Sequence, residues 1–215
     1  MGNAYSSAFS RSTQQFFTNE VDTVEHLRVA IFGATFVGKS SIVSQIVSKT
    51  FPLEHKTTLD ETVILSLASD KGVENVRFLD TSGTFVFPAM RQLYIANSHI
   101  FLVVYSLDME NSFEEARKIV NEIQEQRPNE NIPILLLGNK KDIPKEEREI
   151  SAEVADLLAI DWDVTEHIFT SAASYEDNVN VLRKILSYST EVSIRNRTSS
   201  RSMQNRFNSA CRKEM

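Results

Sequence analysis

The sequence lacks the features of a membrane-spanning, secreted or disulfide-stabilised protein. Its 215 residues contain one cysteine, Cys211, so no disulfide can form within the chain, in agreement with a reducing compartment. No apolar run reaches the roughly 18 residues of a transmembrane helix. The first residues lack the basic and apolar regions of a secretory signal, and no internal repeat is present. We therefore expect one cytoplasmic domain with tails.

Negative charge predominates, but not along the whole chain. The formal net charge is −6. Residues 193–215 contain six basic residues and one acid, Glu214, so they carry +5 and the rest of the chain carries −11. An acidic body argues against nucleic-acid binding. The basic stretch either meets an anionic membrane face or stays solvated. Its bases are Arg195, Arg197, Arg201, Arg206, Arg212 and Lys213.

Composition divides the chain into a central domain and two polar ends. Residues 1–25, rich in Ser, Thr, Asn and Gln, predict a disordered N-terminal arm. Residues 26–192 predict the globular domain, and residues 193–215 predict a disordered basic C-terminal tail.

Within the central domain, apolar runs alternate with stretches of helical spacing. This alternation predicts an α/β fold with a doubly wound, mostly parallel six-stranded sheet and flanking helices, whose ligands bind beyond the carboxyl ends of the strands. A capping box from Ser112 to Glu115 predicts a helix start. The predicted strands are 27–32, 62–68, 74–79, 99–106, 133–138 and 167–171, and the predicted helices are 39–49, 88–97, 112–126, 151–159 and 178–191.

The segment GATFVGKS, from Gly33 to Ser40, matches the phosphate-binding pattern G-x-x-x-x-G-K-[ST]. It lies between a predicted strand and a predicted helix, an arrangement that directs backbone N–H groups and a helix N-terminus at an anion. Lys39 would reach the β- and γ-phosphates, and the Ser40 hydroxyl would bind Mg²⁺. The competing interpretation is a glycine-rich turn in the core. The predicted nucleotide contacts are Gly33, Ala34, Thr35, Phe36, Val37, Gly38, Lys39, Ser40 and Ser41.

A second motif, Asp80-Thr81-Ser82-Gly83, follows the predicted strand 74–79. A carboxylate that leaves a buried strand is well placed to hold Mg²⁺, so Asp80 is a predicted metal ligand. Gly83 would let its backbone N–H approach a γ-phosphate. Alone, this short pattern is more often a turn, but its place after the glycine loop favours a role in binding.

A third motif, Gly138-Asn139-Lys140-Lys141-Asp142, follows the predicted strand 133–138. The Asp142 carboxylate would accept hydrogen bonds from the N1–H and N2–H₂ groups of guanine, a donor pair that adenine lacks. Asn139 is expected to tie this loop to the glycine loop, and the stem of Lys140 to lie along the base. Three motifs at three strand ends predict a guanine nucleotide site.

These residues resemble the small GTPases of the Ras superfamily, and the Ras-like branch most closely, over residues 27–191. The resemblance implies a P-loop NTPase fold, GTP/GDP and Mg²⁺ as ligands, and GTP hydrolysis. It also implies three kinds of protein partner: effectors, a guanine nucleotide exchange factor and a GTPase-activating protein. Phe51 falls where the family packs an aromatic against guanine, and Ser171-Ala172 where a backbone group contacts the guanine carbonyl. Thr58 falls on the switch I threonine that binds Mg²⁺ beside Ser40 and Asp80.

Departures from the family pattern bear on hydrolysis. Thr84 stands where the family has the glutamine that orients the attacking water, and its shorter hydroxyl cannot fill the same role. Thr35 and Phe36 replace small glycines, and a side chain at the Thr35 position crowds the arginine finger and the glutamine. An arginine finger is worth about 10³–10⁵ in rate, so its exclusion matters. We expect Lys39 to stabilise transition-state charge and hydrolysis to be slow.

The predicted switch I segment departs as well. Lys56 stands where the family has an acid, which inverts a charge on the effector-facing edge. We expect weaker binding of standard Ras effectors; neutral surface drift is the alternative.

The N-terminus Met1-Gly2-Asn3-Ala4-Tyr5-Ser6 fits the myristoylation pattern M-G-x-x-x-[ST], which predicts a lipid on Gly2. Cys211 is one residue out of place for a prenylation box. One myristoyl chain binds membranes only marginally, so the basic tail is the expected second signal. The predicted location is the cytoplasmic face of a membrane, the plasma membrane above all.

Three functions remain open on the sequence. The first is a GTP-binding Ras-type switch in intracellular signalling, with slow hydrolysis. The second is an interaction module that stays bound to GTP without significant hydrolysis. The third, an adenine-specific P-loop kinase or ATPase, is disfavoured by Asn139, Lys140 and Asp142.

Overall fold

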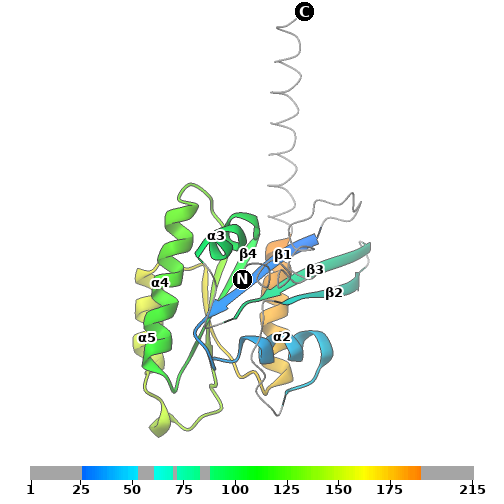
Figure 1. Ribbon diagram of the computed structural model, residues 1–215. Helices are drawn as coiled ribbons and strands as arrows, with labels where there is room; N and C mark the ends of the chain where they lie inside the picture. The colour runs from blue at the N-terminus through cyan, green and yellow to red at the C-terminus, as the bar shows by residue number, and fades with distance from the viewer. Residues whose placement is uncertain (1–25, 53–60, 70–71, 83–87, 190–215) are drawn as a thin grey trace, which may run out of the picture.

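The computed structural model describes residues 26–52, 61–69, 72–82 and 88–189. Six strands form one sheet in the order β2-β3-β1-β4-β5-β6, and only β2 and β3 pair antiparallel (Figure 1). This confirms the predicted α/β fold. The predicted arm and the predicted tail lie outside the described residues. The strands are β1 (His26–Gly33), β2 (Glu61–Ser69), β3 (Gly72–Asp80), β4 (Ile100–Ser106), β5 (Ile134–Asn139) and β6 (Glu166–Phe169).

Helices cover both faces of the sheet (Figure 1). Three of them pack on one face, and α2 and the last described helix, 175–189, pack on the other. Within the described ranges, no helix combines the length and the apolar character needed to cross a membrane. The helices are α2 (Lys39–Ser48), α3 (Pro88–Asn97), α4 (Glu110–Gln126), the 3₁₀ turn η1 (Lys145–Glu147), α5 (Ala152–Asp161) and the helix 175–189.

The central strand β4 shows why the sheet lies between two layers. All seven of its residues are buried. Phe101 and Val103 pack in the core cluster on the α3–α4–α5 side, whereas Leu102 and Val104 pack in the cluster with α2 and helix 175–189. Each buried apolar side chain contributes about 1.5–3 kcal/mol, so a strand apolar on both faces is stable only between two helical layers.

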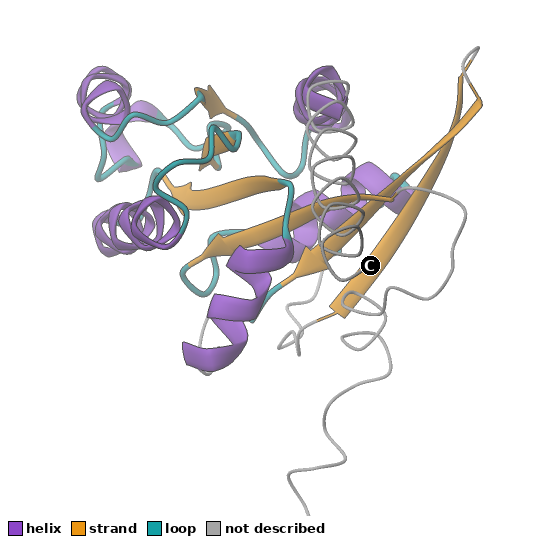
Figure 2. Cartoon of the chain, turned by 90° about the horizontal axis from the view of Figure 1, so that it is seen from above, coloured by secondary structure: helices purple, strands orange, loops and turns teal. Residues whose placement is uncertain are grey.

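The register of the parallel strands brings their carboxyl ends to one edge, and Figure 2 shows the twist of the sheet and the β2–β3 hairpin at its side. Ile31 of β1 lies opposite Asp80 of β3, and Gly33 lies opposite Val104 of β4. Ser106 at the end of β4 lies opposite Asn139 at the end of β5. The residues that follow these strands therefore meet in space.

A series of polar contacts, running from the buried Tyr105 to the exposed Asp156, connects three elements on the α5 side. The Tyr105 hydroxyl lies 2.8 Å from His167 Nε2, and His167 Nδ1 lies 2.7 Å from Asp156 Oδ1 of α5. Burial lowers the pKa of His167, against the opposing effect of Asp156. A neutral ring fits both contacts, with Nδ1–H donated to Asp156 and Nε2 accepting from Tyr105. These two contacts link α5 to β6 and β4.

Most element boundaries differ from the sequence expectation by one to three residues, and three of these differences involve residues that support the strand ends. The helix start predicted from the capping box was wrong, because α4 begins at Glu110. The Ser112 hydroxyl instead donates to Met109 O and accepts the N–H of Ser106. Strand β6 ends at Phe169 rather than at 171, and the last helix begins at 175 rather than at 178. Side chains of that helix bind the backbone after β6: Asp177 accepts the N–H of Ser171, and Asn178 donates to Ser171 O.

Candidate functional site

The loop after β1 is shaped by its two glycines. Gly33 has φ 144° and Gly38 has φ 95°, both in the region that favours glycine. A Cβ on Gly33 would lie 2.1 Å from the carbonyl oxygen of Val104, and a Cβ on Gly38 would lie 2.3 Å from Asn139 Nδ2. Close contact with the ends of β4 and β5 thus requires glycine at both positions.

The loop leads into the N-terminus of α2. Its N-cap, Gly38, supplies no side-chain hydrogen bond, and the first turn contains no acid. The N–H groups of such a helix end are suited to an anion. The ammonium of Lys39, a side chain only 6% exposed, donates to Gly33 O at 3.0 Å and to Ala34 O at 2.7 Å. A positive charge therefore lies across the loop, as a phosphate site requires.

Two of the three predicted metal ligands, Asp80 and Ser40, lie on neighbouring elements. Asp80 ends β3 and is buried, while Ser40 is the second residue of α2. The Thr81 hydroxyl donates to Ile31 O at 2.6 Å and fixes the end of β3 against β1. Within the described ranges no three His, Cys, Asp or Glu side chains form a metal cluster. One carboxylate and one hydroxyl fit Mg²⁺, which takes few protein ligands and completes its shell with phosphates and water.

Asn139 joins the glycine loop to the far side of the site. Its Nδ2 donates to Val37 O at 2.7 Å, and its Oδ1 accepts the N–H of Ala172 at 2.9 Å. The side chain is 1% exposed, so both hydrogen bonds are shielded from water. This confirms the prediction that Asn139 ties its loop to the glycine loop.

Lys140 has a partner that the sequence did not suggest. Its ammonium lies 3.0 Å from Asp108 Oδ2, and the Ser106 hydroxyl donates to the same carboxylate. Burial alone would raise the pKa of Asp108, but the hydrogen bonds from Ser106 and Lys140 outweigh it and lower the pKa. Lys140 also has φ 65°. The ion pair thus fixes the head of Lys140 at the end of β4.

The Ser171-Ala172 loop is held by two residues that sequence reasoning missed. The N–H of Ser171 donates to Asp177 Oδ2 at 3.0 Å, and Lys141 lies 2.6 Å from the other oxygen of Asp177. Asn178 Nδ2 donates to Ser171 O at 2.9 Å, and Asn178 is fully buried. The predicted helix begins at 178 and the observed helix at 175, so the prediction left Asp177 outside the helix.

The remaining predicted site residues are less enclosed. Phe36 is 60% exposed and has φ 62°, and Phe51 is 45% exposed. Asp142 is exposed beyond Asn139, while Thr35 and Ser41 are half-buried. The predicted residues Thr58, Gly83, Thr84 and Gly2 lie outside the described residues.

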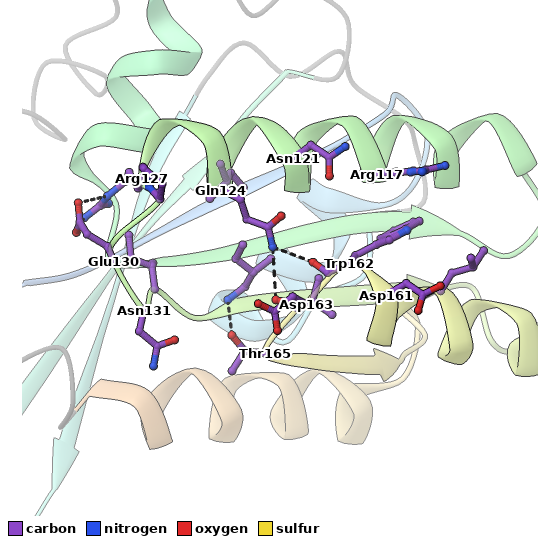
Figure 3. Close-up of a pocket in the computed structure, with 16 residues that line it drawn as sticks. Arg117, Asn121, Gln124, Arg127, Glu130, Asn131, Asp161, Trp162, Asp163 and Thr165 are labelled. Carbon is purple, nitrogen blue, oxygen red and sulfur yellow. Dashed lines mark hydrogen bonds and ion pairs between the residues drawn. The ribbon is translucent and has the colours of Figure 1, made fainter.

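A separate cleft of about 570 Å³ lies at the other end of the strands, where β5 and β6 begin (Figure 3). It is lined by α4, by the end of α5 and by the loops that lead into β5 and β6. Several of its polar groups bind one another: Gln124 donates to the carbonyl of Trp162 at 2.8 Å, and the N–H of Ile134 donates to Thr165 Oγ1 at 3.0 Å. None of the predicted site residues lines it.

Comparison with known proteins yields one family. The sequence model of the Ras family matches residues 28–191. GTP-binding protein Di-Ras2 of Mus musculus is 40% identical over 136 residues, 63% of this chain and 68% of the relative. GTP-binding protein Di-Ras1 of Homo sapiens is 37% identical with the same coverage. GTP-binding protein drn-1 of Caenorhabditis elegans is 34% identical over 162 residues, 74% of this chain and 73% of the relative.

The two hydrogen bonds of Asn139 predict a large effect on stability. Asn139→Ala leaves the Val37 carbonyl and the Ala172 N–H unpaired, at about 1–3 kcal/mol each. We expect the free energy of unfolding in urea to fall by about 2–6 kcal/mol. The exposed Asn180→Ala is the matched control and should change it by less than about 0.5 kcal/mol. Equal losses in the two variants would contradict the linking role of Asn139.

Proposed function

We propose that this chain, which belongs to the Ras family, is a GTP-binding molecular switch in intracellular signal transduction. The observation that carries the proposal is the side chain of Asn139, which connects the phosphate loop to the Ser171-Ala172 loop while Asp142 stands exposed beside it. The names of the relatives, all GTP-binding proteins, support guanine nucleotide as the ligand.

The phosphates would lie in the loop between Gly33 and Lys39. Its backbone N–H groups and the N-terminus of α2 would donate to the phosphate oxygens, and the Lys39 ammonium would move from loop carbonyls to the β- and γ-phosphates. Mg²⁺, when bound by Ser40, Asp80 and Thr58, would neutralise charge on those oxygens.

The base would lie between Phe51 and the Asn139–Asp142 loop. The Asp142 carboxylate would accept the two guanine donors, and the Lys140 stem, anchored by Asp108, would cover one face of the ring. Ser171 and Ala172 would close the far side, held in place by Asp177 and Asn178.

Switching would rest on the segments around Thr58 and Gly83. The Thr58 hydroxyl and the Gly83 backbone N–H would be ordered by the γ-phosphate and released once the γ-phosphate is lost. Effector proteins would bind the ordered state, while an exchange factor and a GTPase-activating protein would set the lifetimes of the two states. Lys56, at the predicted effector edge, favours effectors other than the standard Ras ones.

The chemical step is attack of water on the γ-phosphorus of GTP, which yields GDP and phosphate. We infer that it is slow, because Thr84 is too short to orient the water and because Thr35 narrows the approach to the γ-phosphate. The same residues favour a second candidate, an interaction module that stays bound to GTP.

Membrane attachment is a further part of the proposal. Myristate on Gly2 would give an affinity of about 10⁴ M⁻¹. The basic tail, residues 193–215, would add about 1 kcal/mol per basic residue near an anionic leaflet. Together they predict reversible, salt-sensitive binding to the cytoplasmic face of the plasma membrane.

Base selectivity gives the first test. In competition binding, the wild-type chain should prefer GTP to ATP, and Asp142→Ala should weaken GTP binding by about 10²–10⁴-fold, because two hydrogen bonds to a charged acceptor are lost. The control Asp163→Ala removes an exposed acid away from the predicted site and should leave GTP affinity unchanged. Equal affinity for GTP and ATP would refute a guanine site.

Single-turnover GTP hydrolysis tests the catalytic inference. Thr84→Gln should raise the rate by about tenfold or more, the effect of about 1.4 kcal/mol removed from the barrier. Ser187→Gln, on an exposed position of helix 175–189, should not. A wild-type rate as high as that of Thr84→Gln argues against the inference. Mostly GTP on the purified wild-type chain would favour the locked module, and mostly GDP the cycling switch.

Lipidation is tested in cells. Gly2→Ala should move the chain from the membrane fraction to the soluble fraction, because the arginine-rich tail alone is released by salt. Asn3→Ala is the matched control. An unchanged distribution of Gly2→Ala would rule out the lipid.

A further inference from the structure

Helix α5 is apolar on both of its sides. Ala155 and Ala159 are buried against the sheet. On the outward side Val154, Leu157 and Ile160 are 51%, 66% and 75% exposed. A contiguous exposed apolar strip marks a binding surface.

The outward strip of α5 is also acidic. At 100° per residue, Glu153 and Asp161 fall on the same side of the helix as Leu157. Both are exposed, and neither makes an ion pair or hydrogen bond through its side chain within the described part of the chain. Like-charge repulsion disfavours contact of this face with an anionic membrane. A face that is both acidic and apolar fits a binding segment that is both basic and apolar.

The basic tail, residues 193–215, has this chemistry. It carries a net charge of +5. Met203, Phe207 and Cys211 recur every fourth residue, the spacing that places side chains on one stripe of a helix. Arg206 and Arg212 stand next to two of them in the sequence. Residues 193–215 lie outside the described ranges, so only their sequence is compared with the described surface of α5.

The last described helix, 175–189, ends at the edge strand β6, on the face of the sheet opposite α5. Tyr188, near the end of helix 175–189, donates to Glu166 of β6 at 2.7 Å, and Lys184 lies 2.8 Å from the same carboxylate. The next residue of β6, His167, contacts Asp156 of α5 at 2.7 Å. One edge strand thus separates the start of the tail from α5. Twenty-six residues, 190–215, can span at most about 90 Å, several times the distance across a small domain.

We propose that the basic tail docks on the outward face of α5 of its own chain. Met203 and Phe207 cover Leu157 and Ile160, and the arginines of the tail neutralise Glu153 and Asp161. The docked tail and an anionic leaflet compete for the same arginines, so docking withholds the second membrane signal. The docking itself does not depend on whether the chain binds GTP.

The chain carries its own probes for this contact. Trp162, which caps α5, is the single tryptophan, and Cys211 in the tail is the single cysteine; Figure 3 shows Trp162 and Asp161 at the end of this helix. We would attach a fluorescent acceptor to Cys211 of the full chain and measure energy transfer from Trp162. We expect transfer in the wild type that is independent of protein concentration and is reduced by salt.

Two sets of variants test the contact from either side. Leu157→Glu with Ile160→Glu should lower the transfer to the level that the wild type shows at high salt, whereas Ile64→Glu, at an exposed apolar residue of β2, should not. Arg206→Glu with Arg212→Glu should lower the transfer to the same level, and adding Glu153→Lys with Asp161→Lys should restore it. Unlabelled chains serve as a check on the dye, because amide hydrogen exchange in α5 should become faster in the tail variant.

Three outcomes would overturn the proposal. The first is transfer in the α5 variant that is as efficient as in the wild type. The second is transfer that falls on dilution, which would assign the face to the tail of a second copy. The third is hydrogen exchange in α5 that does not respond to the tail variant.

Discussion

The carboxyl edge of the sheet depends on the buried amide of Asn139. One side chain satisfies the carbonyl of Val37 in the glycine loop and the N–H of Ala172 in the loop after β6. Gly38 must lack a Cβ for this contact, since a Cβ there would lie 2.3 Å from the amide nitrogen. The glycine that shapes the phosphate loop is thus also the glycine that admits Asn139.

This constraint is effective because the sheet beneath it is rigid. The parallel register sets Ser106 opposite Asn139 and Ile31 opposite Asp80, and strand β4 is buried along its full length. Side chains on both faces of β4 lie between helical layers, so the strand ends cannot shift independently. The loops of the proposed nucleotide site are therefore held by the core as well as by the contacts of Asn139.

The motifs could be predicted because each consists of contiguous residues after an apolar run, as in Gly33–Ser40. The supporting residues could not. Asp108 lies 32 positions from Lys140, and Asp177 lies 36 positions from Lys141, so no local pattern connects either pair. The role of Ser112 was mispredicted for a related reason. Its sequence context suggests a helix cap, but its hydroxyl oxygen accepts the N–H of Ser106 at the end of β4. Family membership was predicted from the motifs and agrees with the match over residues 28–191.

The central claim is that the edge held by Asn139 is a guanine nucleotide site. Its most direct test is the identity and amount of nucleotide released when the purified full-length chain is denatured. We predict guanine nucleotide, GDP or GTP, at one equivalent per chain, and its loss in Asn139→Ala. Adenine nucleotide, or a folded wild-type chain that releases none and binds no added GTP, would contradict the account.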